Sequence, residues 1–321
     1  MTDLSGDVTP PAGERPTAAT GTGRIHDAPD PRDGRVYVMS DDIDLAVRVM
    51  LATGRPLLLR GDPGSGKSSL AAYFARQRGW RYYEHVVTSR TQARDLLWTF
   101  DSVRRLADAE VHRRGAELND YDYVEPGVLW WAFARDSALR RGAPEGVSLS
   151  KPAVEPDETT NSARSKDHAV VLIDEIDKAD PDMPNGLLVP LGSNEFVVSE
   201  TGTVIGPAAR AGQAGSAGRR VVIITTNEER ALPQAFLRRC VVLWLPSPGP
   251  DRLVAIAQAH LTVYEKTFTP ADESLAQALA AELIDLRGAA AQQALRAPST
   301  AEYLDALRDC RTLNISVGSS P

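Results

Sequence analysis

The stretch LLLRGDPGSGKSS, Leu57 to Ser69, decides the fold class of this 321-residue chain. A short apolar run that predicts a strand leads into a glycine-rich loop, and Lys67 then opens a predicted helix. Residues 61–68 match the pattern G-x-x-x-x-G-K-[ST] in full. Glycines let successive backbone N–H groups turn toward an anion, and the helix N-terminus adds partial positive charge. The stretch therefore predicts a phosphate-binding loop between a strand and a helix.

A second motif, VVLIDEID, begins at Val170 and places two acids after a buried-type strand. Ligands of open α/β sheets bind at the carboxyl ends of the strands, which is where Asp174 and Glu175 fall. We expect Asp174 to hold the shell of a Mg²⁺ ion through water, and Glu175 to orient and polarise an attacking water as general base. Two solvated acids at a strand end are the alternative, which the complete phosphate loop disfavours.

Two further motifs follow, each next to a predicted strand. IITTN ends in Asn227, whose amide can hold a water or a phosphate oxygen; by itself, Asn227 is equally typical of an ordinary turn. LPQAFLRRC places Arg238 and Arg239 just before the strand VVLWLP. An arginine can neutralise charge that develops on a γ-phosphate, within one chain or from a neighbour, although isolated arginines are more often solvated surface charges.

Composition narrows the class of protein. The net charge of -7 does not indicate a general electrostatic grip on nucleic acid. Cys240 and Cys310 lack metal or redox spacing, and the five histidines are scattered, which disfavours a zinc site. No apolar run approaches the roughly 18 residues of a membrane span, and the N-terminus lacks the basic-then-apolar order of a signal peptide. We expect a cytoplasmic protein that does not enter a membrane.

The chain divides by pattern into an α/β core and a helical region. Ile43, Ala46, Val47 and Met50 predict one buried helix face, residues 91–109 and 126–141 predict two more helices, and residues 195–205 predict a hairpin. The expected divisions are a disordered tail over 1–34, a core over 35–246 with flexible loops at about 142–167 and 206–219, a helical lid over 247–313, and a disordered tail over 314–321.

The order of the motifs resembles that of the AAA+ ATPases. Asn227 lies 53 residues after Asp174, and Arg239 lies 12 residues after Asn227. The stretches IDEIDKADPDMPNGLL and LPQAFLRRC are most similar to the MoxR-like group, the dynein-related AAA subfamily, and the resemblance covers about residues 36–312. It implies a doubly wound sheet of five parallel strands in order 5-1-4-3-2, a small C-terminal helical lid, and a homo-oligomeric ring that is usually hexameric.

The resemblance also implies roles for individual residues. Asp174 and Glu175 match the Walker B acids, Asn227 matches sensor 1, and Arg239 takes the arginine-finger position, with Arg238 the second candidate. The implied cofactors are ATP and Mg²⁺, and the Mg²⁺ ion is expected to bind Ser68 directly and Asp174 through water. The implied catalytic residues are Glu175, Lys67, Asn227 and the two arginines. The residues implied to bind the nucleotide are Asp174, the Walker A loop and the serine that follows the loop, Ser69. The loop consists of Gly61, Asp62, Pro63, Gly64, Ser65, Gly66, Lys67 and Ser68.

One position departs from the family pattern. The group often carries a sensor 2 arginine at the start of the third lid helix, where this chain has Ser299 or Thr300 in RAPSTAEYL. Arg296 is close but belongs to the preceding turn. The departure puts lid-coupled closure in doubt more than ATP binding.

The resulting expectation is a Mg²⁺-dependent ATPase ring that remodels or activates a separately encoded, unidentified protein partner. A slow, ATP-gated assembly switch is one alternative, and a DNA-acting ring motor is another. The acidic net charge disfavours the motor. Trp130 and Trp131 are adjacent on a predicted helix and so point in different directions, which favours core packing with a subunit contact over nucleobase stacking.

Overall fold

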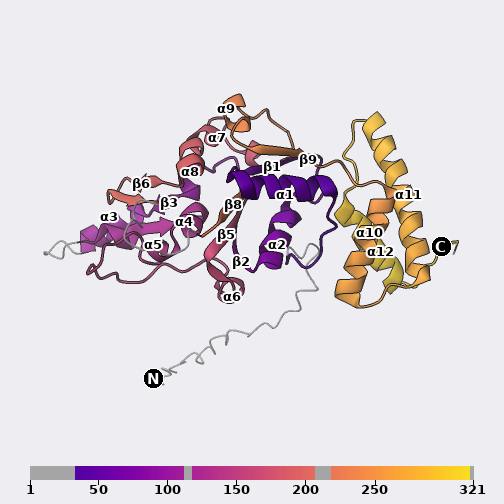
Figure 1. Cartoon of the computed structure of the whole chain (residues 1–321), viewed down its shortest axis with the longest axis horizontal. Coiled ribbons are helices and arrows are strands. Elements are labelled where there is room, and N and C mark those ends of the chain that lie inside the picture. Colours follow the sequence, from indigo (N-terminus) through magenta and orange to yellow (C-terminus); the bar gives the residue numbers. More distant parts are fainter. Residues whose placement is uncertain (1–32, 112–117, 207–217, 319–321) are drawn as a thin grey trace, which may run out of the picture. The chain divides into compact units, whose positions relative to one another are not determined.

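Five parallel strands form the central sheet of the computed structural model, which describes residues 33–111, 118–206 and 218–318. Read from β9 and counted along the chain within this sheet, the strand order is 5-1-4-3-2. Across the sheet (Figure 1) the strands are β2 (Trp80–Val86), β5 (Ser165–Asp174), β8 (Arg220–Thr226), β1 (Leu57–Arg60) and β9 (Val241–Trp244).

Each inner strand contains a continuous apolar run, Leu57–Leu59 in β1, Ala169–Ile173 in β5 and Val221–Ile224 in β8, because both faces of the sheet are buried there. Along β1, Leu57 and Leu59 enter one hydrophobic cluster, whereas Leu58 enters the other. A continuous apolar run is the pattern of a parallel strand covered on both sides by helices.

Helices α1 (Asp41–Thr53) and α2 (Lys67–Arg78) supply the cover on one face (Figure 1). The buried side chains of α1 are the four that the sequence predicts, so that prediction is confirmed. The helix ends at Gly54, which adopts the left-handed conformation (φ 69°) that glycine tolerates best.

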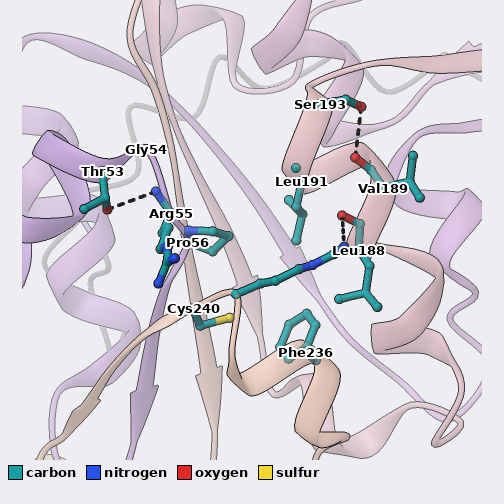
Figure 2. Close-up of a pocket in the computed structure, with 12 residues that line it drawn as sticks. Thr53, Gly54, Arg55, Pro56, Leu188, Val189, Leu191, Ser193, Phe236 and Cys240 are labelled. Atoms are coloured by element: carbon teal, nitrogen blue, oxygen red, sulfur yellow. Dashed lines mark hydrogen bonds between the residues drawn. The ribbon is translucent and has the colours of Figure 1, made fainter.

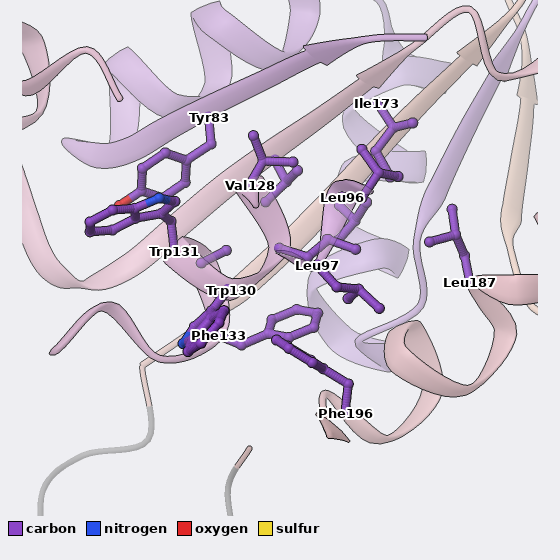
Figure 3. Close-up of a cluster of buried hydrophobic side chains, with 14 of the residues drawn as sticks. Tyr83, Leu96, Leu97, Val128, Trp130, Trp131, Phe133, Ile173, Leu187 and Phe196 are labelled. Carbon is purple, nitrogen blue, oxygen red and sulfur yellow. The ribbon is translucent and has the colours of Figure 1, made fainter. Parts of the chain in front are cut away.

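The opposite face is covered by a cluster that contains Trp130 and Trp131, both almost fully buried (Figure 3). Trp130 packs edge-on against Phe196 with ring centroids 5.6 Å apart, and Trp131 belongs to the same buried cluster as Tyr83. Core packing is therefore confirmed for both tryptophans, and neither ring is exposed for base stacking.

The predicted helix over 126–141 is interrupted. Helix α4 (Val128–Phe133) is followed by Ala134, whose backbone (φ -151°, ψ 67°) is not helical, and α5 (Arg135–Leu139) begins at the next residue. The break lets the α4 side chains enter the core while Arg135 reaches an acid on another segment.

The predicted helix over 91–109 is wrong for its first half. The chain instead forms a 3₁₀ turn, η2 (Ala93–Leu96), then strand β3 (Trp98–Phe100), and only then helix α3 (Ser102–Val111). Strand β3 pairs with β4 (Val124–Pro126), which follows a second 3₁₀ turn, η3 (Asp120–Tyr123). A tertiary contact overrides the local pattern, because Trp98 stacks on Phe196 at 5.6 Å.

The segment 142–167, expected as a flexible loop, is packed against strand β2. It contains helix α6 (Glu158–Asn161) and reaches the start of β5. Asn161 is fully buried, and its side-chain amide bonds both the N–H and the C=O of Tyr82. An asparagine thus satisfies part of the free edge of β2, which an edge strand otherwise leaves open to aggregation.

Short elements connect the sheet strands. The predicted hairpin over 195–205 is confirmed as β6 and β7, with Gly202 (φ 68°) at its turn. The elements between β5 and β9 are η4 (Ile176–Lys178), α7 (Met183–Gly186), α8 (Leu188–Ser193), β6 (Phe196–Val198), β7 (Thr203–Ile205) and α9 (Gln234–Leu237).

After β9 the structure is helical and has its own hydrophobic cluster, built around Leu253, Ala276 and Tyr303. Its elements are α10 (Pro250–His260), the π-helical turn η6 (Leu261–Glu265), α11 (Pro270–Gln292) and α12 (Thr300–Thr312). Among the described residues, no helix is both long and apolar enough to cross a membrane. The predicted N-terminal tail and the loop at 206–219 lie largely outside the described residues, whereas the predicted C-terminal tail over 314–321 lies outside them only at 319–321.

Candidate nucleotide site

The predicted phosphate loop joins the carboxyl end of β1 to the first residue of α2. Gly61 (φ 141°) leaves no room for a side chain, because a Cβ there would lie 2.1 Å from the carbonyl oxygen of Leu245. Gly64 (φ 78°) is equally confined, since its Cβ would lie 2.7 Å from Cβ of Ser299. Both glycines are therefore required by close approach as well as by backbone conformation.

Lys67 is buried beneath the loop. Its Nζ donates to the carbonyl oxygens of Gly61 and Asp62, both at 2.7 Å. Burial lowers the pKa of the Lys67 ammonium, although nearby negative charges, of which Asp174 is the strongest, act in the opposite direction. The amine is thus held at the loop with its pKa below the ordinary lysine value.

Asp174 lies at the end of β5 and is almost completely buried. Its Oδ1 accepts from the Ser68 hydroxyl at 2.7 Å and from the Thr225 hydroxyl at 2.6 Å. Ser68 and Asp174 are 106 positions apart in sequence, and the parallel sheet brings them together at one edge. A hydroxyl and a carboxylate in contact are the hard oxygen donors that suit Mg²⁺, which uses few protein ligands and completes its shell with water and phosphate.

Thr225 connects the two acids, a role that its sequence position at a strand end did not reveal. Its hydroxyl donates to Asp174 and also accepts from the backbone N–H of Glu175 at 2.9 Å. A short side chain at the end of β8 therefore fixes both the carboxylate and the turn that follows it.

Glu175 adopts the left-handed conformation (φ 60°, ψ 50°), which costs a non-glycine residue about 1–2 kcal/mol. Its Oε1 accepts from the amide Nδ2 of Asn227 at 3.1 Å, and its Oε2 pairs with Lys178 Nζ at 3.0 Å. The hydrogen bond that Lys178 donates to the Glu175 carboxylate raises the pKa of Lys178. Strain of this kind persists only where surrounding contacts hold it, and it is concentrated at functional sites.

Lys178 and Asp177 belong to this site although the sequence patterns did not single them out. Asp177 is buried and accepts from the backbone N–H groups of Asn227 (3.4 Å) and Glu229 (2.9 Å). It thereby anchors the turn that carries Asn227. The sequence spacing of Glu175 and Lys178, three residues apart, was the available signal for their ion pair.

The two predicted arginines are not part of this cluster. Arg238 and Arg239 are exposed and precede β9, which runs parallel to β1 with Val241 level with Leu57. The phosphate loop follows the opposite end of β1. Four strand residues span about 13 Å, so the arginines start at the far end of the sheet from their own chain's loop.

Arg239 instead lines a pocket of about 510 Å³ between α8, α9 and residues 53–56. Its Nη1 donates to the carbonyl oxygen of Leu188 at 2.9 Å. Leu188, Phe236 and Cys240 form the apolar side of the pocket (Figure 2). Burial raises the pKa of the Cys240 thiol to about 12, so the thiol stays protonated at neutral pH.

At the start of α12, Ser299 occupies the place next to Gly64. Ser299 caps the helix, since its hydroxyl accepts from the N–H of Glu302. Arg296, the alternative cation, has an exposed side chain that pairs with Glu302 at 3.2 Å. Its guanidinium is therefore held on the α12 turn.

Fold and site together define a class: a phosphate-loop nucleotide-binding protein with paired acids at the end of β5, which β8 separates from β1 in the sheet. The profile of the AAA domain (dynein-related subfamily) matches residues 56–240, which is more than half of the chain. The chain belongs to this family and is an AAA+ ATPase.

Two other comparisons complete the picture. No curated protein matches the sequence. Among solved structures, the crystal structure of "a putative ATPase" from Cytophaga hutchinsonii is similar with a TM-score of 0.43 and 13% identity. The match covers 87% of this chain and 61% of that chain, so this chain spans less than two thirds of that protein.

Proposed function

We propose that this chain is a MoxR-like ATPase that hydrolyses Mg²⁺-bound ATP at the boundary between neighbouring copies in a cytoplasmic ring, hexameric by the family pattern. Hydrolysis drives the C-terminal helices against the core, and that movement remodels or activates a protein partner. The observation that carries the proposal is the separation of the Glu175 cluster from Arg239, at opposite ends of the same sheet.

Each residue then has a defined task. Residues 61–69 hold the phosphates through backbone N–H groups, and Lys67 binds the β- and γ-phosphates. Ser68 and, through water, Asp174 would hold Mg²⁺, which would neutralise phosphate charge. Glu175 accepts the proton of the attacking water, and Asn227 keeps its carboxylate in place through the bond to Oε1.

Arg239 completes the site of the next copy. Its distance from its own loop leaves it free to meet a neighbour's γ-phosphate, where an arginine stabilises the charge of the transition state. Such a head-to-tail contact repeats identically from copy to copy and closes into a ring.

Mixed rings test the shared site. Glu175→Gln and Arg239→Ala are each expected to be inactive alone. When the two variants are co-expressed, turnover should recover to at most about a quarter of the wild-type value. Each pair of neighbours can be filled by the two variants in four ways, and only one of them places an intact Glu175 opposite an intact Arg239.

The matched control pairs two defects on the same half of the site. Co-expressed Lys67→Ala and Glu175→Gln should recover nothing, since every site lacks one of the two residues. Recovery in the control, or none in the test when mixed assembly is demonstrated by native mass spectrometry, contradicts a site shared in this way.

A slow assembly switch is the second candidate. Two observations favour it: Ser299 stands where the family pattern places a cation, and Lys178 holds Glu175 in an ion pair. Turnover on the order of 1 per second or more in the assembled protein would argue against the switch.

A further inference from the structure

Arg287, near the end of α11, joins two segments that both reach the phosphate loop. Its Nη1 donates to the carbonyl oxygen of Pro248 at 3.1 Å, on the connection between β9 and α10. Its Nε donates to Pro298 O at 2.9 Å, and its Nη2 contacts the Thr300 hydroxyl at 3.4 Å. One guanidinium thus holds the start of α12 to the entrance of the helical region.

The first segment, residues 245–249, lies against the loop at two points. The carbonyl of Leu245 occupies the space beside Gly61. The hydroxyl of Ser247 donates to the carboxylate of Asp62 at 2.9 Å. Pro248, which accepts from Arg287, is the next residue along the chain.

The second segment reaches the loop through Ser299. This residue stands between the two acceptors Pro298 and Thr300, and its Cβ lies where a side chain on Gly64 would have to fit. Both segments therefore contact the phosphate loop at one point and Arg287 at another, so that Arg287 is linked to the loop through each of them.

The charge of Arg287 also interacts with the phosphate loop, through Asp62. Burial lowers the pKa of the guanidinium, while the negative charge of Asp62 raises it. Arginine remains protonated in proteins. Its planar guanidinium can donate to three acceptors at fixed angles, which a lysine ammonium on a flexible stem does not reproduce.

We propose that Arg287 is the positioning residue that keeps the start of α12 and the 245–249 segment seated on the phosphate loop, so that nucleotide binding and the position of the helical region are coupled. This proposal rests on the proposed function. Arg287 acts through Pro248, Pro298 and Thr300 and does not touch the nucleotide, unlike an arginine at the Ser299 position.

Hydrogen exchange with and without AMP-PNP and Mg²⁺ tests the coupling in the full chain. In the wild type, the nucleotide should slow exchange in residues 61–69 and in residues 299–303. In Arg287→Met, protection of 61–69 should remain while protection of 299–303 is lost, and the Kd for AMP-PNP should rise about tenfold, as expected for loss of charge-assisted hydrogen bonds.

Arg308→Met is the matched control, because Arg308 is a lid arginine whose ion pair with Asp305 stays within α12. It should behave as the wild type. Arg287→Lys keeps the charge but not the fork, and it should give a Kd between those of the wild type and Arg287→Met. If Arg287→Met loses its helical signal in circular dichroism, Arg287→Lys takes its place as the test variant.

The outcomes separate the two proposals. Wild-type protection of 299–303 in both Arg287 variants, with Kd values within twofold of the wild type, overturns the role of Arg287 alone. A wild-type chain without protection of 61–69 overturns the proposed function and this coupling together.

Discussion

The two ends of the central sheet differ in how completely this chain builds them. At the carboxyl ends of β1, β5 and β8, Lys67 donates to backbone carbonyls, and the other functional side chains bond to one another: Ser68 and Thr225 to Asp174, and Asn227 and Lys178 to Glu175. At the amino end of β9, Arg239 is exposed, and its guanidinium donates a hydrogen bond to the backbone carbonyl of Leu188.

The difference indicates a division of labour. Buried hydrogen-bonded groups are positioned before any ligand arrives, which is what preorganised chemistry requires. An exposed guanidinium held by one carbonyl can change partner at small cost. In the proposed ring, the carboxyl end would carry the part of the site that one chain supplies, and the amino end would carry the part that it offers to another.

The largest expected effect comes from removing Arg239, the exposed residue at the amino end of β9. Arg239→Ala should lower turnover about 10³-fold in the assembled protein, the lower range for loss of an arginine finger. Arg238→Ala, the adjacent exposed arginine, is the control and should lose much less. Steady-state ATPase assays above the assembly concentration measure both, and the reverse ranking would make Arg238 the finger.

Glu175→Gln removes the proton acceptor from the other end of the sheet. Turnover should fall about 10²-fold or more, while the Kd for ATP stays near the wild-type value, because the amide keeps the shape of the side chain but not its basicity. Binding by filter assay and single-turnover hydrolysis separate the two quantities. Unchanged turnover would remove Glu175 as the base.

Thr225→Val tests whether preorganisation matters at the carboxyl end. The valine leaves the N–H of Glu175 and one bond of Asp174 unsatisfied, which costs about 1–3 kcal/mol of unfolding free energy. We also expect turnover to fall about tenfold, because both acids lose a common support.

Thr226→Val is the matched control, since Thr226 is equally buried but accepts only from the N–H of Glu228. Its stability should fall by a similar amount with little loss of turnover. Equal losses of turnover in the two variants would mean that Thr225 acts on stability alone.

The smallest effect is a pH dependence that belongs only to the carboxyl end. The protonated form of Lys67 binds phosphate, and burial lowers its pKa, so ATP affinity should decline at a pH below the ordinary lysine value of 10.5. Folding stability should change in the opposite sense. The unfolded chain binds this proton more tightly, so the Lys67 contribution rises with pH between the folded pKa and 10.5.

Titration calorimetry over an alkaline series measures the decline in affinity. Lys67→Arg should remove it within that series, since arginine stays protonated. Arg239→Ala should leave its midpoint unchanged. A midpoint that moves with Arg239 would place that residue near its own chain's nucleotide.

Much of the fold followed from local pattern. The four buried residues of α1, the hairpin at Gly202 and the apolar strand before Asp174 all obey simple periodicities. The failures lie where long-range packing dominates: Trp98 is drawn into a strand by Phe196, and the polar 142–167 segment is held by Asn161 on the edge of β2.

The sequence by itself determined the phosphate loop and the order of acid, amide and arginine, because glycine conformations and residue types along one strand end are local properties. Only the tertiary structure decided that Thr225 links the two acids, that Arg287 joins two segments beside the loop, and that Arg239 lies at the other end of the sheet. Those relations depend on strand register and helix packing, which bring together residues far apart in the chain and leave no periodic trace in it.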